Sequence, residues 1–188
     1  MSELDRWNTR YAEADGHLFG EAPNAFLARR ADLLKPGWSA LAVADGDGRN
    51  GVFLAEQGLA VRSVDFSPVA QEKARRLAEA RGVTLTFELA DVAAYSWPHE
   101  AYDVVAAIFF QFLSPADRAV AFRGIADALR PGGLLLLEGY TPKQLEYGTG
   151  GPKAVEQLYT RALLEDAFAG FTTVSIEEYD AELDEGGA

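Results

Sequence analysis

The stretch between Ser39 and Asp65 constrains the fold more than any other part of this chain. It begins with an apolar run, residues 41–44, of the length and flanking expected for a buried parallel strand. A polar turn, a helix and a second apolar run ending at Asp65 follow. Three glycines stand in the turn: Gly46, Gly48 and Gly51. This pattern predicts a right-handed strand–helix–strand unit whose turn lies at the carboxyl edge of the sheet, where open α/β sheets bind ligands.

The turn matches the G-x-G-x-x-G pattern of dinucleotide sites, but its charges favour a different ligand. A pyrophosphate binds to bare backbone N–H groups and a helix N-terminus. Here Asp45 and Asp47 flank the first glycine, and Arg49 offsets only one of them. Each carboxylate would repel a pyrophosphate by about 1 kcal/mol or more at contact. We therefore expect a cationic ligand without phosphate, such as S-adenosylmethionine, while simple turn formation by two aspartates is the structural alternative.

Composition excludes several classes of protein. The 188 residues suit a single domain with a full core, and the formal net charge of −12 argues against a nucleic-acid partner. Six of the acids lie between Glu177 and Glu185. The absence of cysteine excludes disulfides, thiolate zinc sites and cysteine nucleophiles, and two histidines make no convincing metal site. No targeting signal or membrane-spanning run is recognisable, so we expect a cytoplasmic protein without a membrane partner.

The rest of the chain alternates helices with strands. Helices are expected over residues 3–14, 24–34, 68–81, 115–129 and 158–168, and further strands over residues 83–89, 102–108, 134–138 and 172–178. Helices that follow strands in this way predict a doubly wound, mainly parallel α/β sheet in one domain.

At this point several motifs together resemble a known family. In order, they are the ADGDG turn, VDFS at the second strand, AD at the third, YDVV at the fourth and LRPGG before the fifth. Their order and spacing resemble a class I S-adenosylmethionine-dependent methyltransferase with a Rossmann-like fold. The segments WNTRYAEADGHLFGEAPNAFL, GDGRN and YTPKQLEYGTGGPK are similar to the tellurite-resistance and thiopurine-methyltransferase-like branch. The resemblance covers nearly the whole chain.

The resemblance implies a function and a division of the chain. The function is methyl transfer from S-adenosylmethionine to a small molecule, with a soft thiol, selenol or metalloid oxyanion favoured as acceptor. Residues 1–37 would form an N-terminal helical lid, residues 38–141 the cofactor-binding core, and residues 142–188 the substrate-side loop, helix and last strand. We expect a monomer or weak homodimer.

The sequence departs from the family pattern in two places. Ala42 stands where the family has an acid and Ala44 where it has a glycine, so either Asp45 or Asp47 must take over the role of that acid. The family also ends with an antiparallel strand beside the fifth, whereas residues 182–188 contain no such apolar run. The final antiparallel strand is therefore expected to be missing, which leaves an apolar edge at residues 134–137. We expect a truncated chain or association through that edge.

The candidate site residues follow from the ends of the strands and from the resemblance. Asp65 would bind the ribose, Phe66 would lie against the adenine, and Asp91 and Val92 would read its amino group. The cofactor-binding set is Tyr11, Asp45, Gly46, Asp47, Gly48, Asn50, Asp65, Phe66, Asp91, Val92, Ile108 and Phe109. The candidates for the acceptor side are Phe19, Gln111, Tyr140 and Tyr147. Neither a catalytic residue nor a metal ligand is identified.

Two other functions remain open. The G-x-G-x-x-G match would suit a nicotinamide-dependent oxidoreductase. Because Ala42 and Ala44 replace the residues of the family pattern, a cofactor-binding protein without turnover is the second alternative.

Overall fold

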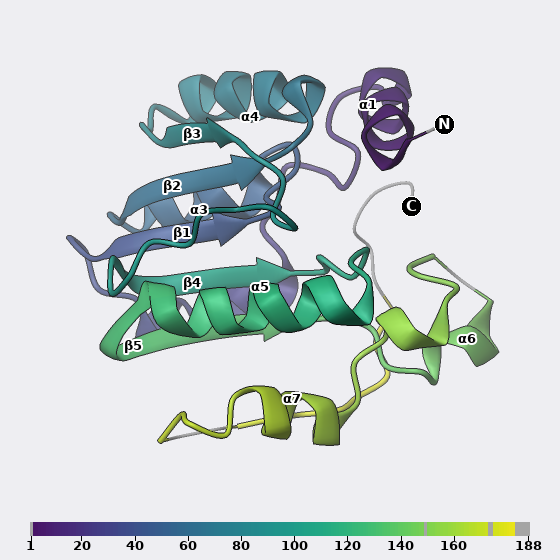
Figure 1. Ribbon diagram of the computed structural model, residues 1–188. Coiled ribbons are helices and arrows are strands. Elements are labelled where there is room, and N and C mark those ends of the chain that lie inside the picture. Colours follow the sequence, from purple (N-terminus) through teal and green to yellow (C-terminus); the bar gives the residue numbers. More distant parts are fainter. Residues whose placement is uncertain (1, 149, 173–174, 183–188) are drawn as a thin grey trace.

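The computed structural model describes residues 2–148, 150–172 and 175–182 (Figure 1). Within them, one sheet has the strand order β3-β2-β1-β4-β5, and all neighbouring strands are parallel. The strands are β1 (Ser39–Val43), β2 (Ala60–Asp65), β3 (Thr86–Leu89), β4 (Tyr102–Ile108) and β5 (Leu129–Glu138). The order reverses between β1 and β4, so the carboxyl ends of these two strands mark the crevice where such sheets bind ligands.

The helices begin where the sequence provides caps. Ser67 and Ser114 each accept a hydrogen bond from a backbone N–H in the first turn of their helix, and each is followed by proline at the first helical position. The helices are α1 (Glu3–Glu13), α2 (Ala25–Arg29), α3 (Arg49–Glu56), α4 (Pro68–Arg81), α5 (Pro115–Ala128), α6 (Gln144–Tyr147) and α7 (Arg161–Ala167), with short 3₁₀ turns η1 (Ala31–Leu33) and η2 (Val155–Gln157).

The core has two layers, one on each face of the sheet. Along β1, Leu41 and Val43 pack toward α5, whereas Ala40 and Ala42 pack toward α2 and α3. This alternation follows from the two-residue period of a strand. Figure 1 shows α5 crossing one face of the sheet, with α3 behind the other. The expected doubly wound parallel fold is thus confirmed.

Two helix boundaries and the starts of β3 and β5 differ from the sequence-based expectation; β3 begins at Thr86 rather than residue 83. The helix expected over residues 24–34 ends at Arg29 and continues only as η1. The helix expected from residue 158 begins at Arg161, because Thr160 caps it and the two preceding residues pack into the core. β5 begins at Leu129 rather than residue 134, because the Arg-Pro-Gly-Gly segment is a bulge within the strand.

The strand expected over residues 172–178 is wrong for the residues that the structure describes. Residues 175–178 belong to no strand, and residues 173–174 lie outside the described part. The segment is attached through polar contacts that include the ion pairs of Arg30 with Glu177 (3.5 Å) and Lys143 with Asp180 (2.6 Å). Side-chain contacts of this kind do not impose the regular backbone pairing that defines a strand.

Among the described residues, no helix combines the length and the apolar character needed to cross a membrane.

Candidate functional site

The ends of β1 and β4 carry unusual backbone conformations. Ala44 follows β1 with φ of 49°, and Phe109 follows β4 with φ of 54°. Both values lie in the left-handed region, which residues other than glycine rarely adopt. Strained residues of this kind cluster at functional sites, and these two flank the point where the strand order reverses. The candidate site therefore lies at this carboxyl edge.

The glycine turn after β1 owes its shape to close packing. A Cβ atom at Gly48 would lie 2.5 Å from Cβ of Ala74 in α4, and a Cβ atom at Gly46 would lie 2.4 Å from the hydroxyl of Tyr11. At Gly51 an added Cβ would collide with the carboxylate of Asp45. The three glycines thus let α4, the N-terminal segment and a buried acid approach the turn.

The side chain of Asp45 stabilises the turn through buried hydrogen bonds. Its carboxylate accepts hydrogen bonds from the Ser63 hydroxyl (2.7 Å) and the Gly51 backbone N–H (2.9 Å). Burial raises the pKa of Asp45 to about 7. About half of Asp45 is then uncharged at neutral pH, so the argument from two charged aspartates against a phosphate ligand is weaker than the sequence suggested. Both carboxylate oxygens hold the turn, which favours the structural alternative for this residue.

Asp47 joins the turn to the N-terminal segment. Its carboxylate accepts a hydrogen bond of 2.6 Å from the backbone N–H of Leu18. Burial raises the pKa of Asp47, although this hydrogen bond and nearby His17 oppose the shift. Arg49, the cation beside it in sequence, donates to the backbone oxygen of Phe19 (3.3 Å). The polar groups of the turn therefore fasten the segment that was expected to form a lid.

Asp65 lies at the end of β2, beside the same turn. Its two oxygens accept hydrogen bonds from the backbone N–H groups of Gly46 and Ser67, both at 2.8 Å. The side chain is almost fully buried, and burial raises its pKa. A carboxylate has capacity for about four hydrogen bonds, so this one is suited to bind a diol as well as the two N–H groups. The contact with a ribose stays a prediction.

Tyr11 packs over the turn from α1. It is buried with Leu18 and Ala70, and its ring stacks on that of Trp7 at 5.7 Å between centroids. Burial, followed by the charge of Asp65, raises the pKa of Tyr11, so its hydroxyl stays protonated near neutral pH. Phe19 packs in the same cluster. The structure therefore brings Tyr11 close to the predicted cofactor turn.

A narrow slot lies beside Asp65. The rings of Phe66 and Phe112 are nearly parallel, at 6° and 6.0 Å between centroids. Asp91 and Val92 line the slot together with these two rings. The two rings are too close to admit a base between them, so the slot offers the ring of Phe66 and the acid Asp91 beside Asp65. Sequence reasoning missed Phe112, although its place four residues after the end of β4 was a usable signal.

The other candidates gather where β4 and β5 end. The rings of Phe109 and Tyr140 lie 4.5 Å apart between centroids. Gln111 is buried; its Nε2 donates to the backbone oxygen of Tyr140 (2.9 Å) and its Oε1 accepts from the N–H of the same residue. Gln111 thus fixes the position of Tyr140. Tyr147 is half exposed on α6, and Figure 1 shows that helix to one side of the sheet.

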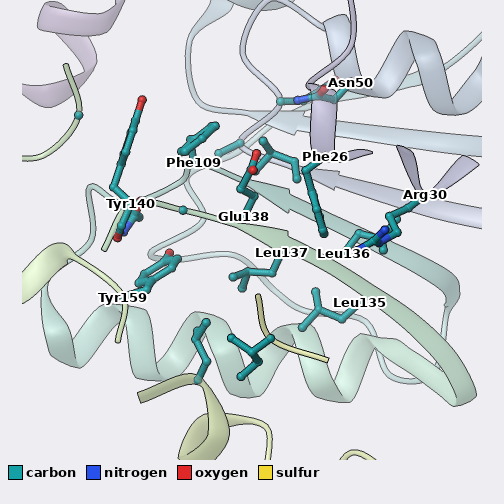
Figure 2. A pocket seen from close by; sticks show the side chains of 18 of the residues that line it. Phe26, Arg30, Asn50, Phe109, Leu135, Leu136, Leu137, Glu138, Tyr140 and Tyr159 are labelled. Carbon is teal, nitrogen blue, oxygen red and sulfur yellow. The ribbon is translucent and has the colours of Figure 1, made fainter. Parts of the chain in front are cut away.

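One large cavity connects this region with the open side of β5. Figure 2 shows Phe109, Glu138 and Tyr140 at its upper end and Leu135, Leu136 and Leu137 along its floor. Ile108, Gly46, Gly48 and Asn50 complete the carboxyl edge; of these, Gly48 is absent from the cavity wall. Glu138 was not among the candidates, although an acid that ends an apolar strand run, as Asp65 also does, was a usable signal.

The donor set of this edge fits S-adenosylmethionine. Three carboxylates surround the glycine turn, and an aromatic slot adjoins Asp65. Such a set suits a ligand that carries an ammonium, a sulfonium, a diol and a flat base. It suits a pyrophosphate less, because an ionised carboxylate beside the turn repels phosphate.

Comparisons with known proteins also bear on which ligand this site binds. The family described as a methyltransferase domain matches residues 40–133, which is half of the chain. A demethylmenaquinone methyltransferase from Thermus thermophilus is 38% identical over 104 residues. The match covers 54% of this chain and 47% of that relative, so it spans about half of the relative's length.

Solved structures show the same fold. The crystal structure of TehB from Haemophilus influenzae has a TM-score of 0.67 at 18% identity and covers 88% of this chain and 54% of that chain. An S-adenosylmethionine-dependent methyltransferase from Geobacter sulfurreducens, solved with S-adenosyl-L-homocysteine, has a TM-score of 0.65 at 20% identity. That match covers 90% of this chain and 71% of the other. At these identities the two structures establish the fold alone.

Proposed function

Since the chain belongs to the methyltransferase domain family, we propose that it transfers a methyl group from S-adenosylmethionine to a small-molecule acceptor. The observation that carries the proposal is the pair of acids beside the glycine turn, Asp47 and Asp65, at the point where the strand order reverses. A nicotinamide-dependent oxidoreductase would place a pyrophosphate against these groups.

Each part of the cofactor has a proposed partner. Asp65 binds the ribose diol, Phe66 lies against the adenine, and Asp91 with Val92 lies at its polar end. The backbone of the turn and Asn50 hold the amino-acid portion, while Ile108 and Phe109 line the side toward the acceptor. When bound, S-adenosylmethionine supplies an electrophilic methyl group. The role of the chain is to hold donor and acceptor at attack distance and to exclude water.

The acceptor is proposed to be soft. A thiol, a selenol or a metalloid oxyanion needs less activation than a hydroxyl, and Gln111, a candidate on the acceptor side, has its amide committed to backbone groups. Tyr140, Tyr147 and Phe19 would contact the acceptor. The proposed branch is the tellurite-resistance and thiopurine-methyltransferase-like one. This part of the proposal rests on the motifs of the sequence.

We propose that three segments of the chain have the roles that the sequence suggested. Residues 1–37 act as a lid, residues 38–141 hold the cofactor, and residues 142–188 face the acceptor. The lid proposal is supported by hydrogen bonds that fasten Leu18 to Asp47 and Asn24 to Asn50. The proposed cellular form is a cytoplasmic monomer or weak homodimer, and the net charge of −12 supports a protein without a nucleic-acid partner.

Ligand binding tests the proposal. Isothermal titration with S-adenosylhomocysteine should show saturable binding, and scanning calorimetry should show stabilisation of about 2.7 kcal/mol at a ligand concentration 100 times the Kd. Asp65→Asn should weaken binding tenfold or more, because charge-assisted hydrogen bonds contribute about 1.5–3 kcal/mol each. Asp127→Asn, an exposed change on α5, is the matched control.

Three outcomes would contradict the proposal. NADH binding that is tighter than S-adenosylhomocysteine binding would favour an oxidoreductase. Tight S-adenosylhomocysteine binding without methyl transfer to thiols, selenols, selenite or amines would favour a binding protein without turnover. The absence of any binding at millimolar S-adenosylhomocysteine would remove the methyltransferase proposal for this chain.

A further inference from the structure

Glu138 places a carboxylate on the acceptor side of the proposed cofactor site. It is the last residue of β5 and lies in register with Ile108 of β4. Figure 2 shows its side chain in the cavity, between Phe109 and Phe26 and pointing toward the region of Asn50. The carboxylate therefore lies beside the ring of Phe109 and next to Asn24, on the side of the cavity that we propose for the acceptor.

Hydrogen bonds from two distant segments fix this carboxylate. The side-chain amide of Asn24, the cap of α2, donates to Oε2 at 2.6 Å. The hydroxyl of Tyr179, in the C-terminal segment, donates to Oε1 at 2.9 Å. Arg29 in turn donates to that hydroxyl at 3.0 Å. A half-buried carboxylate held by at least two donors has a defined orientation, which a residue that acts on a bound molecule requires.

Three groups near Glu138 are poorer proton acceptors than its carboxylate. Gln111 is committed to the backbone of Tyr140 and Gln157. Tyr179 donates to Glu138 and, since burial and this hydrogen bond raise its pKa, stays a neutral phenol. Arg29 contributes positive charge one step away, through Tyr179. A carboxylate with these neighbours can accept a proton, whereas neither Arg29 nor the Gln111 amide can at neutral pH.

We propose that Glu138 is a catalytic residue that orients a neutral thiol or selenol acceptor and takes the proton that the acceptor loses. The inference rests on the proposed function and narrows its acceptor class. The acceptor atom gains a bond to the methyl carbon and loses its bond to hydrogen. The electron pair of the broken carbon–sulfur bond stays on the donor sulfur, and the proton passes to the carboxylate and then to water. The same carboxylate repels a metalloid oxyanion, so a neutral protic acceptor is preferred over selenite.

Two thiols of different acidity test the proton-transfer step. At an assay pH of about 8, 2-phenylethanethiol is mainly protonated and thiophenol is mainly ionised. Glu138→Gln should lower kcat/KM for 2-phenylethanethiol by about a hundredfold, the usual range of a positioned base. The rate with thiophenol should stay within about threefold or rise, since no proton is left to remove. Glu79→Gln, the same exchange at an exposed position of α4 outside the cavity lining, is the matched control.

The pH profile provides a second readout. With 2-phenylethanethiol, kcat/KM should fall at acidic pH in the parent as Glu138 becomes protonated, and this limb should be absent in Glu138→Gln. Tyr179→Phe removes one donor to the ionised carboxylate and should move the limb to higher pH. S-adenosylhomocysteine affinity, measured by calorimetry, should stay within about threefold of the parent in both variants.

Several results would overturn the proposal. An equal loss with both thiols would show that Glu138 acts only on structure, and an unchanged rate and pH profile would show that it takes no proton. Faster turnover of selenite than of either thiol by the parent would contradict the acceptor preference. If Glu138→Gln does not fold, an acidic limb that does not move in Tyr179→Phe would decide against the proposal. A parent that binds no S-adenosylhomocysteine would instead overturn the proposed function, and this inference with it.

Discussion

Ionisation of the buried Asp45 side chain lowers the stability of the folded protein at neutral pH. The side chain is buried beside the turn, and burial raises its pKa from 3.8 to about 7. Between these two pH values the folded state binds more protons than the unfolded state, so the contribution of Asp45 makes the free energy of unfolding decrease as pH rises. A shift of about three units corresponds to at most about 4 kcal/mol, at 1.36 kcal/mol per unit.

Asp45→Asn should therefore change how stability depends on pH. The amide keeps an acceptor for the Gly51 N–H but cannot ionise. We expect the stability of the variant relative to the parent to increase by about 1–3 kcal/mol between pH 4 and pH 8. Urea denaturation at both pH values measures this difference. A relative stability that is the same at both values, or that falls as pH rises, would show that Asp45 does not have the raised pKa.

The site residues that sequence reasoning found are those whose position follows from one local unit. Asp65 and Phe66 stand at the end of β2, so the strand–turn–helix–strand pattern placed them at the carboxyl edge. Glu138 and Phe112 gain their significance from partners 114 and 46 residues away in sequence, Asn24 and Phe66. No local pattern reports such a contact.

At the scale of elements, the end of β1 stores strain. Ala44 adopts φ of 49°. The left-handed conformation costs alanine about 1–2 kcal/mol, whereas glycine adopts it without this cost. Part of the gain from glycine is lost, because glycine has more freedom in the unfolded chain. Ala44→Gly should therefore raise the free energy of unfolding by about 0.5–1 kcal/mol.

A second alanine in the same strand provides the control. Ala40 is fully buried in extended backbone, so Ala40→Gly should lower the free energy of unfolding by about 1 kcal/mol. Chemical denaturation of both variants and the parent gives the comparison. Ala44→Gly would contradict the strain argument if it lost as much stability as Ala40→Gly.

The elements near the centre of the sheet were predictable and those at its β5 side were not. β1 and β4 are buried on both faces, so their apolar runs define them without help from other segments. An ion pair of 2.7 Å between Arg130 and Asp103 holds the bulge. The start of β5 depends on this contact. The segment after α7 has strand-like alternation, but its described residues do not pair with any strand. Strand propensity therefore did not decide its structure.

At the scale of the whole molecule, the two edge strands of the sheet differ in what lies beside them. β3 is a short strand with α4 packed against it, whereas β5 is a long strand with a cavity on its free side. Acids of the C-terminal segment, among them Glu177, Glu178 and Asp180, lie on the other wall of that cavity. An apolar strand edge favours pairing with another chain, while a shared acidic charge opposes it.

Association should therefore increase with salt. The Debye length falls from about 10 Å at 0.1 M to about 3 Å at 1 M, which screens the repulsion between acidic segments of two copies. We expect a monomer at low salt and a growing fraction of dimer at high salt in light scattering and sedimentation.

Leu135→Lys, on the free strand, should keep the protein monomeric at both salt concentrations, because a charged residue blocks edge pairing. Val120→Lys, which replaces an exposed apolar residue on α5, should dimerise as the parent does. Dimerisation that is as strong in Leu135→Lys as in the parent, or a parent that stays monomeric in 1 M salt, would show that β5 is not the surface through which two copies meet.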